Sequence, residues 1–209
     1  MSTEQPTTIY LPPPSQKGKV SLEEAISRRR STREFTSKPV SQSQLSQILW
    51  AAQGISDKQW KYRTVPSAGA TYPLEIFVVC QRDGIEGMDD GIYHYIIADH
   101  CLTLLHRGDV RADLAGAALN QEFIYQAPLD IVICALYQRT TFGYGSRGER
   151  YVHIEAGHAG QNIYLQAAAL GLATVAIGAF NDERVREALQ LDWQYKPLYI
   201  MPVGRPASS

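Results

Sequence analysis

Hydrophobic positions in residues 41–54 repeat with the period of an α-helix. The apolar face of this segment consists of Leu45, Ile48, Leu49 and Ala52. Residues 22–26 carry a shorter stripe of the same kind, and both stripes follow a serine that has Glu or Gln three residues later, which is a capping box. The pattern therefore predicts one helix after Ser21 and another after Ser41, with Gly54 as the C′ residue that ends the second.

After residue 73 the pattern changes to short, β-rich apolar runs. The predicted strands are Leu74–Cys80, Gly91–Ile97, His100–Arg107, Leu129–Tyr137, Ala173–Gly178 and Pro197–Gly204. Further helices are predicted over Asp109–Leu119, Arg150–Leu170 and Asp182–Leu191. Because helices interrupt the strands irregularly, the order of elements indicates an α+β fold and not a regular α/β winding.

Composition limits the number of domains, the kinds of partner and the cellular compartment that we expect. The chain has 209 residues, 44% of them hydrophobic, and a formal net charge of −1, so we expect one domain over 21–209 behind a Pro-rich N-terminal arm over 1–20. Ordered structure is predicted to begin at Ser21. A balanced charge and the lack of a long apolar run argue against nucleic-acid and membrane partners. Three dispersed cysteines in apolar segments and no signal-peptide core predict a cytoplasmic protein with reduced thiols.

Four arginines and two hydroxyl residues are concentrated in Arg28–Phe35, RRRSTREF. Cations suit the C-terminal end of a helix, so this segment could be a solvated basic helix end. Arginine side chains also bind phosphate oxygens with paired N–H groups, and a serine hydroxyl can complete such a site. Charge alone leaves both interpretations open.

Two other motifs match the sequence patterns of known sites but lack the expected context. Gly143–Gly148 spells G-x-G-x-x-G, but it does not directly follow a strand, so we expect a Gly-rich loop and not a dinucleotide fold. Glu155 and His158 stand at i and i+3, but this metal-ligand pair occurs once, whereas di-iron bundles need it twice. We therefore expect a structural hydrogen bond within the long helix and no metal.

Two stretches of small residues stand beside predicted strands, VPSAGATYPLE at Val65–Glu75 and AIGAF at Ala176–Phe180. A backbone with so few side-chain atoms allows a planar ring to approach its N–H and C=O groups. Together with the arginine segment, these stretches would suit a flat ring with a phosphate tail. Two ordinary tight turns remain the alternative at this point.

The ordered set of motifs resembles the nitroreductase family of FMN-dependent oxidoreductases, in its SagB/thiazole-oxidase-like branch. The set consists of RRSTREF, PSAGATYPLEIFVV, YHY, EAGHAGQNIYLQAAALGL, AIGAF and PVGRP, and it extends from about Ser21 to Pro206. The resemblance implies a central antiparallel sheet flanked by helices in an intertwined homodimer, with the long helix from Arg150 in the dimer core. It also implies ping-pong hydride transfer from NAD(P)H through FMN to a small-molecule acceptor, without an obligatory catalytic side chain.

The same resemblance implies which residues bind the cofactor. Arg29, Arg30, Ser31 and Arg33 would hold the FMN phosphate and ribityl chain, with Arg205 beside the phosphate. The flavin ring would lie against Pro66, Ser67, Ala68 and Gly69 of the neighbouring subunit, and its N5 edge near Ile177, Gly178 and Ala179.

This chain departs from the branch at two places. Peptide azoline dehydrogenases of the branch carry a Lys-Tyr pair, whereas here Gly143 precedes Tyr144; Tyr144 and Arg147 remain candidates for the substrate pocket. Azoline oxidation is therefore an alternative function, as are a non-catalytic flavin-binding protein and a binder of another phosphorylated ligand. The sequence also ends nine residues after Ile200, without the family's basic extension, so the N-terminal arm is expected to embrace the partner or to stay free.

Overall fold

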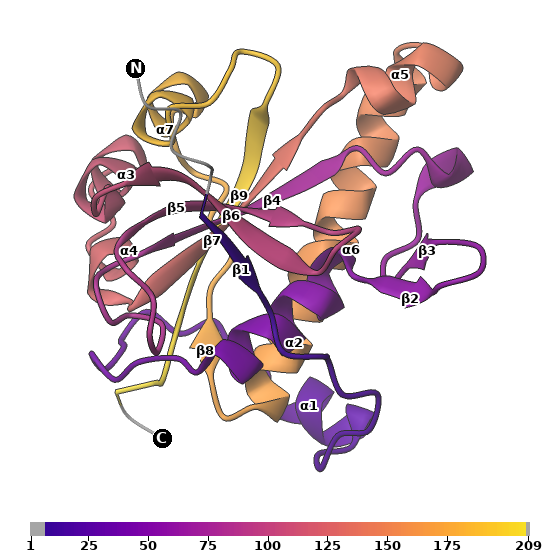
Figure 1. Ribbon diagram of the computed structural model, residues 1–209. Helices are drawn as coiled ribbons and strands as arrows, with labels where there is room; N and C mark the ends of the chain where they lie inside the picture. The colour runs from indigo at the N-terminus through magenta and orange to yellow at the C-terminus, as the bar shows by residue number, and fades with distance from the viewer. Residues whose placement is uncertain (1–6, 208–209) are drawn as a thin grey trace.

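A seven-stranded antiparallel sheet forms the centre of the molecule, in a computed structural model that describes residues 7–207 (Figure 1). The strand order is β1-β6-β5-β4-β7-β9-β8, and every neighbouring pair is antiparallel. The strands are β1 (Thr8–Tyr10), β4 (Leu74–Cys80), β5 (Gly91–Ile96), β6 (Cys101–Arg107), β7 (Leu129–Ala135), β8 (Ala173–Thr174) and β9 (Lys196–Gly204). The prediction of an α+β fold with a central antiparallel sheet is confirmed.

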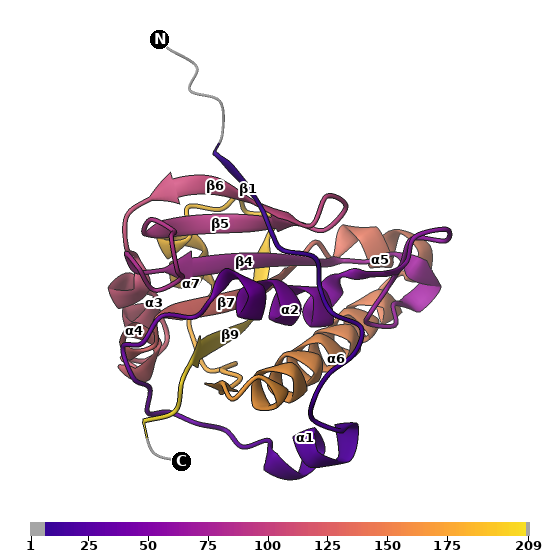
Figure 2. The same ribbon diagram turned by 60° about the horizontal axis from the view of Figure 1, so that its bottom comes forward.

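Helices cover both faces of this sheet (Figures 1 and 2). On one face lie α2 (Gln42–Gln53) and α6 (Arg147–Ala169), and on the other lie α3 (Arg111–Ala117), α4 (Phe123–Gln126) and α7 (Asp182–Ala188). The remaining elements are α1 (Leu22–Arg28), α5 (Gln138–Tyr144), a 3₁₀ turn at Ala68–Ala70 and a hairpin of β2 (Ile55–Asp57) and β3 (Tyr62–Arg63). Within residues 7–207 no helix is both long enough and apolar enough to cross a membrane.

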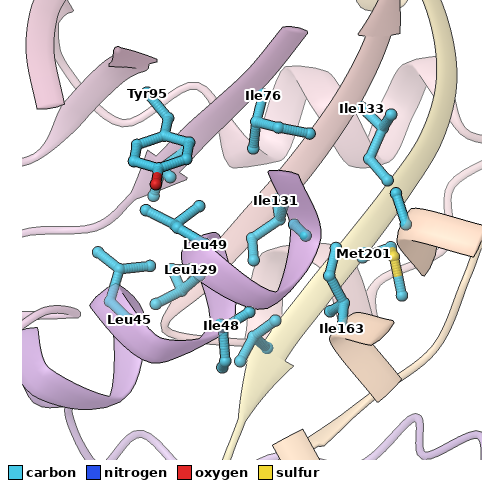
Figure 3. Packing of buried hydrophobic residues seen from close by; sticks show 14 of the residues in the cluster. Leu45, Ile48, Leu49, Ile76, Tyr95, Leu129, Ile131, Ile133, Ile163 and Met201 are labelled. Carbon is cyan, nitrogen blue, oxygen red and sulfur yellow. The ribbon is translucent and has the colours of Figure 1, made fainter. Parts of the chain in front are cut away.

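The central strands β4 and β7 are buried on both faces, which explains why their sequences are almost continuously apolar. On the α2–α6 face, Ile76 and Ile131 pack with Leu49 of α2 and Ile163 of α6 (Figure 3). Residues that alternate with these along the strands, such as Val132, pack against α3 and α7. One hydrophobic layer thus holds α2 and α6 against the sheet, and a second holds α3, α4 and α7 against its other face.

The N-terminal arm is part of this sheet, so the expectation that order begins at Ser21 was wrong. Thr8–Tyr10 pair with β6 of the same chain, and the next residue, Leu11, is buried in the core. The carbonyl of Pro12 accepts a hydrogen bond from the Ser46 hydroxyl of α2 at 2.5 Å. Only three residues pair before the proline run, and the alternation of apolar and polar positions that marks a strand cannot be recognised in so short a segment.

Both predicted helix starts are confirmed, because Ser21 and Ser41 each form a complete capping box. The role predicted for Gly54 differs. Gly54 has φ −64°, so it is not a left-handed C′ residue, and its N–H donates to the carbonyl of Trp50. A Cβ atom here would lie 2.3 Å from a ring carbon of Trp50, so glycine is required by close approach and not by its φ angle.

The expected Gly-rich loop at Gly143–Gly148 was wrong, because this segment joins two helices. Tyr144 ends α5, Gly145 turns the chain with φ +56°, and Arg147 begins α6 three residues before the predicted start at Arg150. A Cβ atom on Gly148 would lie 2.9 Å from Cα of Thr141. The glycines therefore permit a tight corner between packed helices.

The predicted strand Ala173–Gly178 is shorter in the structure. Only Ala173 and Thr174 form β8, after which Ile177 makes an isolated bridge to Ile200 of β9. The intervening Ala176 N–H donates to the hydroxyl of Tyr164, at 2.8 Å, instead of to a neighbouring strand. A side chain from α6 thus interrupts the ladder at this point.

Candidate active site

The arginine segment is held along the outer end of the sheet by its backbone. Ser31 bridges to Thr174 of β8, and the N–H of Thr32 donates to the Thr174 carbonyl at 3.0 Å. Farther along, the N–H of Thr36 donates to the carbonyl of Arg205 at 2.9 Å. The structure therefore brings Arg205, at the end of β9, next to the segment that follows α1.

Tyr164 of α6 organises the start of this segment. The guanidinium of Arg29 lies 5.0 Å from the centre of the Tyr164 ring, and the Ser31 hydroxyl lies 2.9 Å from the Tyr164 hydroxyl. Because the Tyr164 oxygen already accepts the N–H of Ala176, its own hydrogen can go to Ser31. The Ser31 hydrogen is then free to bond to an external anion. Sequence reasoning missed Tyr164, since a tyrosine within a half-buried helix carries no local signal.

The arginines differ in how their side chains are used. Arg30 donates from one nitrogen to the carbonyls of Ser27 and Arg29, both at 2.8 Å, and so caps the end of α1. The guanidinium of Arg33 lies over the ring of Phe123, 5.8 Å from its centre. Among residues 7–207, none of Arg29, Arg30, Arg33 and Arg205 forms an ion pair with an acidic side chain. These four arginines are therefore cations without internal counter-charges among the described residues.

Two buried hydroxyl groups beside the arginine segment are also unsatisfied. Thr36 Oγ1 and Thr174 Oγ1 have no hydrogen-bond partner within the described residues. Most buried side-chain polar atoms do have one, so each such exception calls for an explanation. The stretch AIGAF lies close by through Ala176, with Ile177 buried and Gly178 and Ala179 exposed.

The small-residue stretch at Pro66–Gly69 forms a tight turn at the other end of α6. The Ser67 hydroxyl accepts the N–H of Tyr72 at 2.9 Å, and Gly69 has φ +59°. A Cβ atom on Gly69 would lie 2.7 Å from the hydroxyl of Tyr144. Glycine is therefore required here by both conformation and space.

Tyr144, one of the two predicted substrate-pocket residues, lies against this turn. Besides covering Gly69, the ring of Tyr144 lies edge-on to Tyr151, with 5.2 Å between the centroids. The guanidinium of Arg147 lies 5.9 Å from the centre of the same Tyr151 ring. Tyr144 is thus brought against Gly69, more than seventy residues away in the sequence, and Arg147 is linked to Tyr144 through Tyr151.

Beneath the turn, Glu155 of α6 belongs to a buried polar chain. Its Oε1 accepts from Gln53 at 3.3 Å, and Gln53 in turn accepts from Arg63 at 2.9 Å. Burial raises the pKa of Glu155, opposed by hydrogen bonds from Ser67 and Gln53. The expected hydrogen bond within the long helix was wrong, since the partners of Glu155 lie outside α6 and His158 is exposed. Residues 7–207 contain no grouping of three His, Cys, Asp or Glu side chains that could hold a metal.

The two sets of predicted cofactor residues lie at opposite ends of α6 (Figure 1). Tyr164 contacts the arginine segment, whereas Glu155 supports the small-residue turn. These two residues are nine positions apart, which corresponds to about 13 Å along a helix. A single chain thus contains both sets, but it does not bring them together.

Comparison with known proteins identifies relatives of this chain in both sequence and structure. The protein is 50% identical over 186 residues to MJ1384 of Methanocaldococcus jannaschii, named as a candidate nitroreductase, with 89% of this chain and 91% of the relative covered. The crystal structure of a candidate nitroreductase from Ralstonia eutropha JMP134 superimposes with a TM-score of 0.85 at 31% identity, covering 97% of this chain and 90% of that one.

More distant relatives are named for the processing or synthesis of microcin. The Escherichia coli microcin B17-processing protein McbC is 27% identical over 148 residues, which cover 68% of this chain and 54% of McbC, so the chain spans about half the length of that relative. The structure of the E. coli McbBCD microcin synthetase complex shares the fold, with a TM-score of 0.75 at 24% identity, covering 97% of this chain and 78% of that one. The profile of the nitroreductase family matches residues 26–205, which is most of the sequence. The chain therefore belongs to the nitroreductase family.

Proposed function

We propose that this protein is an FMN-dependent oxidoreductase that takes hydride from NADPH or NADH and delivers it to a small acceptor in a ping-pong cycle. The observation that carries the proposal is a set of arginines without ion-pair partners among the described residues, Arg29, Arg33 and Arg205, near the Ser31 hydroxyl, on a family fold that implies oxidoreductase chemistry. When bound, FMN would supply the redox chemistry at its N5 atom, and the protein would supply position and electrostatics.

The residues of the arginine segment fit the phosphate end of such a cofactor. Arg29 and Arg33 present guanidinium groups that lack internal carboxylate partners, and charged donors of this kind form strong hydrogen bonds to phosphate. Ser31 adds a hydroxyl donor, and Arg205 adds positive charge close by. The Arg30 side chain already caps α1, so we assign it a backbone role in this site.

The flavin ring would need the small-residue turn Pro66–Gly69, which lies at the far end of α6 in the same chain. A second copy of the chain could supply this turn, so we propose a homodimer with two composite sites. Ile177, Gly178 and Ala179 would then face the ring edge from the first copy. Large apolar side chains on the surface support an interface of this kind, namely Leu22, Ile26, Trp60, Tyr62 and Ile154, which are 49–65% exposed.

The first experiment is an absorption spectrum of the protein purified without added cofactor, followed by acid release and light scattering. We expect flavin bands, about one FMN per chain and the mass of a dimer. A colourless monomer that fails to take up FMN would contradict the proposal. Anaerobic addition of NADPH or NADH then tests turnover, since a flavin-binding protein without catalytic activity would stay oxidised.

Azoline oxidation on a peptide is the second candidate function, because McbC and the trifolitoxin operon protein TfxC are among the relatives. In this reaction a thiazoline or oxazoline ring of a peptide would lose two hydrogens to the flavin. Tyr144 and Arg147 are present at the turn, but Gly143 lacks the side chain expected for the branch. Mass spectrometry of a thiazoline peptide incubated with the flavin-loaded protein would detect the loss of two hydrogens.

We also assign the protein to the cytoplasm. Cys80, Cys101 and Cys134 are all buried and unpaired within the described residues, as expected for a reducing compartment.

A further inference from the structure

A cavity of about 420 Å³ lies beside the small-residue turn, between α5 and the connection of β5 to β6. Its lining includes both charged and apolar side chains. The charged and titratable residues are Arg63, Glu75, His94 and Arg139, the aromatic and apolar residues are Tyr72, Tyr95, Ile96, Ile97 and Ala98, and Thr71 completes the lining. The proposed flavin site uses none of these residues.

The acidic residue of the cavity is fully paired. Glu75 Oε2 lies 2.6 Å from Nε2 of His94, and Glu75 Oε1 lies 2.6 Å from a terminal nitrogen of Arg139. Arg139 also donates to the carbonyl of Tyr72 at 3.0 Å. The negative charge of Glu75 and the positive charge of Arg139 therefore balance each other within the wall.

Arg63 has no carboxylate bonded to it directly, although Glu75 and the buried Glu155 lie near enough to interact with its charge. Its guanidinium lies 4.4 Å from the centre of the Tyr72 ring, and one of its nitrogens donates to the neutral amide of Gln53 at 2.9 Å. Within residues 7–207 it forms no ion pair with a carboxylate. A half-buried guanidinium with unused donors favours an anion in the adjacent space.

We propose that this cavity binds a ligand with one carboxylate on an apolar body. The carboxylate would pair with the Arg63 guanidinium, whose planar donors match two carboxylate oxygens. The apolar body would lie against Ile96, Ile97 and Ala98, and the volume is in the range of small-molecule sites. One guanidinium without a direct carboxylate partner suits a monoanion better than a phosphate dianion. This inference does not depend on flavin binding.

Three probes of nearly equal size test the charge requirement, namely hexanoate, hexanamide and hexylammonium. Each is titrated into the protein as purified, and binding is followed by NMR chemical shifts at constant ionic strength. We expect saturable shifts from residues 95–98 with hexanoate, and none with the neutral or cationic probe. Equal binding of all three probes, tighter binding of inorganic phosphate, or no saturable binding of hexanoate would each overturn the proposal.

Two variants test the location. Arg63→Gln should raise the dissociation constant for hexanoate by roughly tenfold or more, because it removes a charge-assisted pair. Arg107→Gln, at an exposed arginine of β6 outside the cavity, is the matched control and should bind like the wild type. Unchanged affinity in a folded Arg63→Gln protein would overturn the proposal.

A third variant keeps the test decisive if Arg63→Gln does not fold. Ala98→Trp places a large ring at an exposed wall position and leaves the charged groups untouched. It should abolish hexanoate binding, and retained binding would overturn the proposal. Flavin content, read from absorbance in the same samples, shows separately whether the proposed oxidoreductase function holds.

Discussion

The two ends of helix α6 differ in how their charged groups are balanced. Toward the C-terminal end, Arg29 lies over Tyr164 of α6, and farther along the same segment Arg33 lies over Phe123 of α4; neither has an acidic partner among the described residues. At the N-terminal end, Glu155 is bonded to Gln53, which is bonded to Arg63. The first end is electrostatically incomplete without an external anion, whereas the buried acid of the second is satisfied internally.

This difference follows from burial. Arg33 is exposed and hydrated, so an unpaired charge costs little there and remains available to a ligand. Glu155 is only 3% exposed, and a buried acid without hydrogen bonds would cost several times as much. Unpaired surface cations held by a rigid backbone are therefore the better guide to where an anionic cofactor binds.

The largest expected effect is on cofactor affinity. Arg33→Ala should weaken FMN binding by ~1.5–3 kcal/mol, because one charge-assisted hydrogen bond is lost, while the free energy of unfolding changes little. Fluorescence titration with FMN measures the affinity. Arg28→Ala is the control, since Arg28 is paired with Glu24 on the surface of α1 at 2.8 Å. Equal flavin affinity in the two variants would mean that the unpaired Arg33 contributes no more to FMN binding than the paired Arg28.

The second test removes the charge of Glu75, which is paired with His94 and Arg139. Glu75→Gln should reduce the free energy of unfolding by ~1–3 kcal/mol at pH 7, because it replaces a nearly buried carboxylate that is bonded to His94 and Arg139. Urea denaturation measures this loss. The exposed Glu86→Gln is the control.

The pH dependence of Glu75 has a definite sign. Burial raises its pKa, but the bond to His94 and the charge of Arg139 outweigh burial, so the pKa lies below the usual value of 4.5. Stability from Glu75 is therefore complete above pH 4.5 and is lost as the pH falls through the lowered pKa. Wild-type stability should drop more steeply than that of Glu75→Gln below pH 4.5; parallel curves would contradict this.

A third test concerns the turn itself. Gly69→Ala should destabilise the protein by ~1–2 kcal/mol, because alanine is strained at positive φ. Adding Tyr144→Phe removes the hydroxyl that would lie 2.7 Å from the new Cβ, so the double variant should recover part of the loss. Thermal denaturation of the four proteins gives the coupling energy. Strict additivity would mean that Tyr144 does not restrict this position.

The smallest effect on stability is expected at Gly143. A Cβ atom there meets nothing within 4 Å, so Gly143→Lys should stabilise α5 by ~0.5–1 kcal/mol. The same variant places a lysine directly before Tyr144 and so restores the Lys-Tyr pair of the branch. If azoline oxidation is limited only by the missing lysine, the variant should oxidise a thiazoline peptide faster than wild type. Gly143→Gln is the control for helix propensity.

Strong local signals predicted most of the fold. The capping boxes at Ser21 and Ser41 and the apolar run of β7 were sufficient because each is determined by neighbouring residues. The hairpin of β2 and β3 was missed, since it turns through Asp57, whose Oδ1 accepts the N–H groups of Gln59 and Trp60, without a glycine or proline. Helix α5 was missed because Gly143 within it and the glycines that follow it suggested a loop.

The candidate site was harder to predict from sequence because its geometry depends on α6. The motifs identified the arginine segment and the small-residue turn, but not their separation along one helix. Tyr164 and Gln53 link these segments to other parts of the molecule through hydrogen bonds between residues far apart in the chain. No local period or spacing encodes such contacts.

The strand contributed by the N-terminal arm has a consequence for solubility. Without Thr8–Tyr10, the long strand β6 would stand at the edge of the sheet with unpaired N–H and C=O groups. Open edges of this kind recruit strands from other molecules, and natural proteins counter this with short covering strands. The arm thus protects the open edge of β6 from pairing with other molecules. A protein that has lost the residues before Leu11 by proteolysis would be prone to self-association through β6.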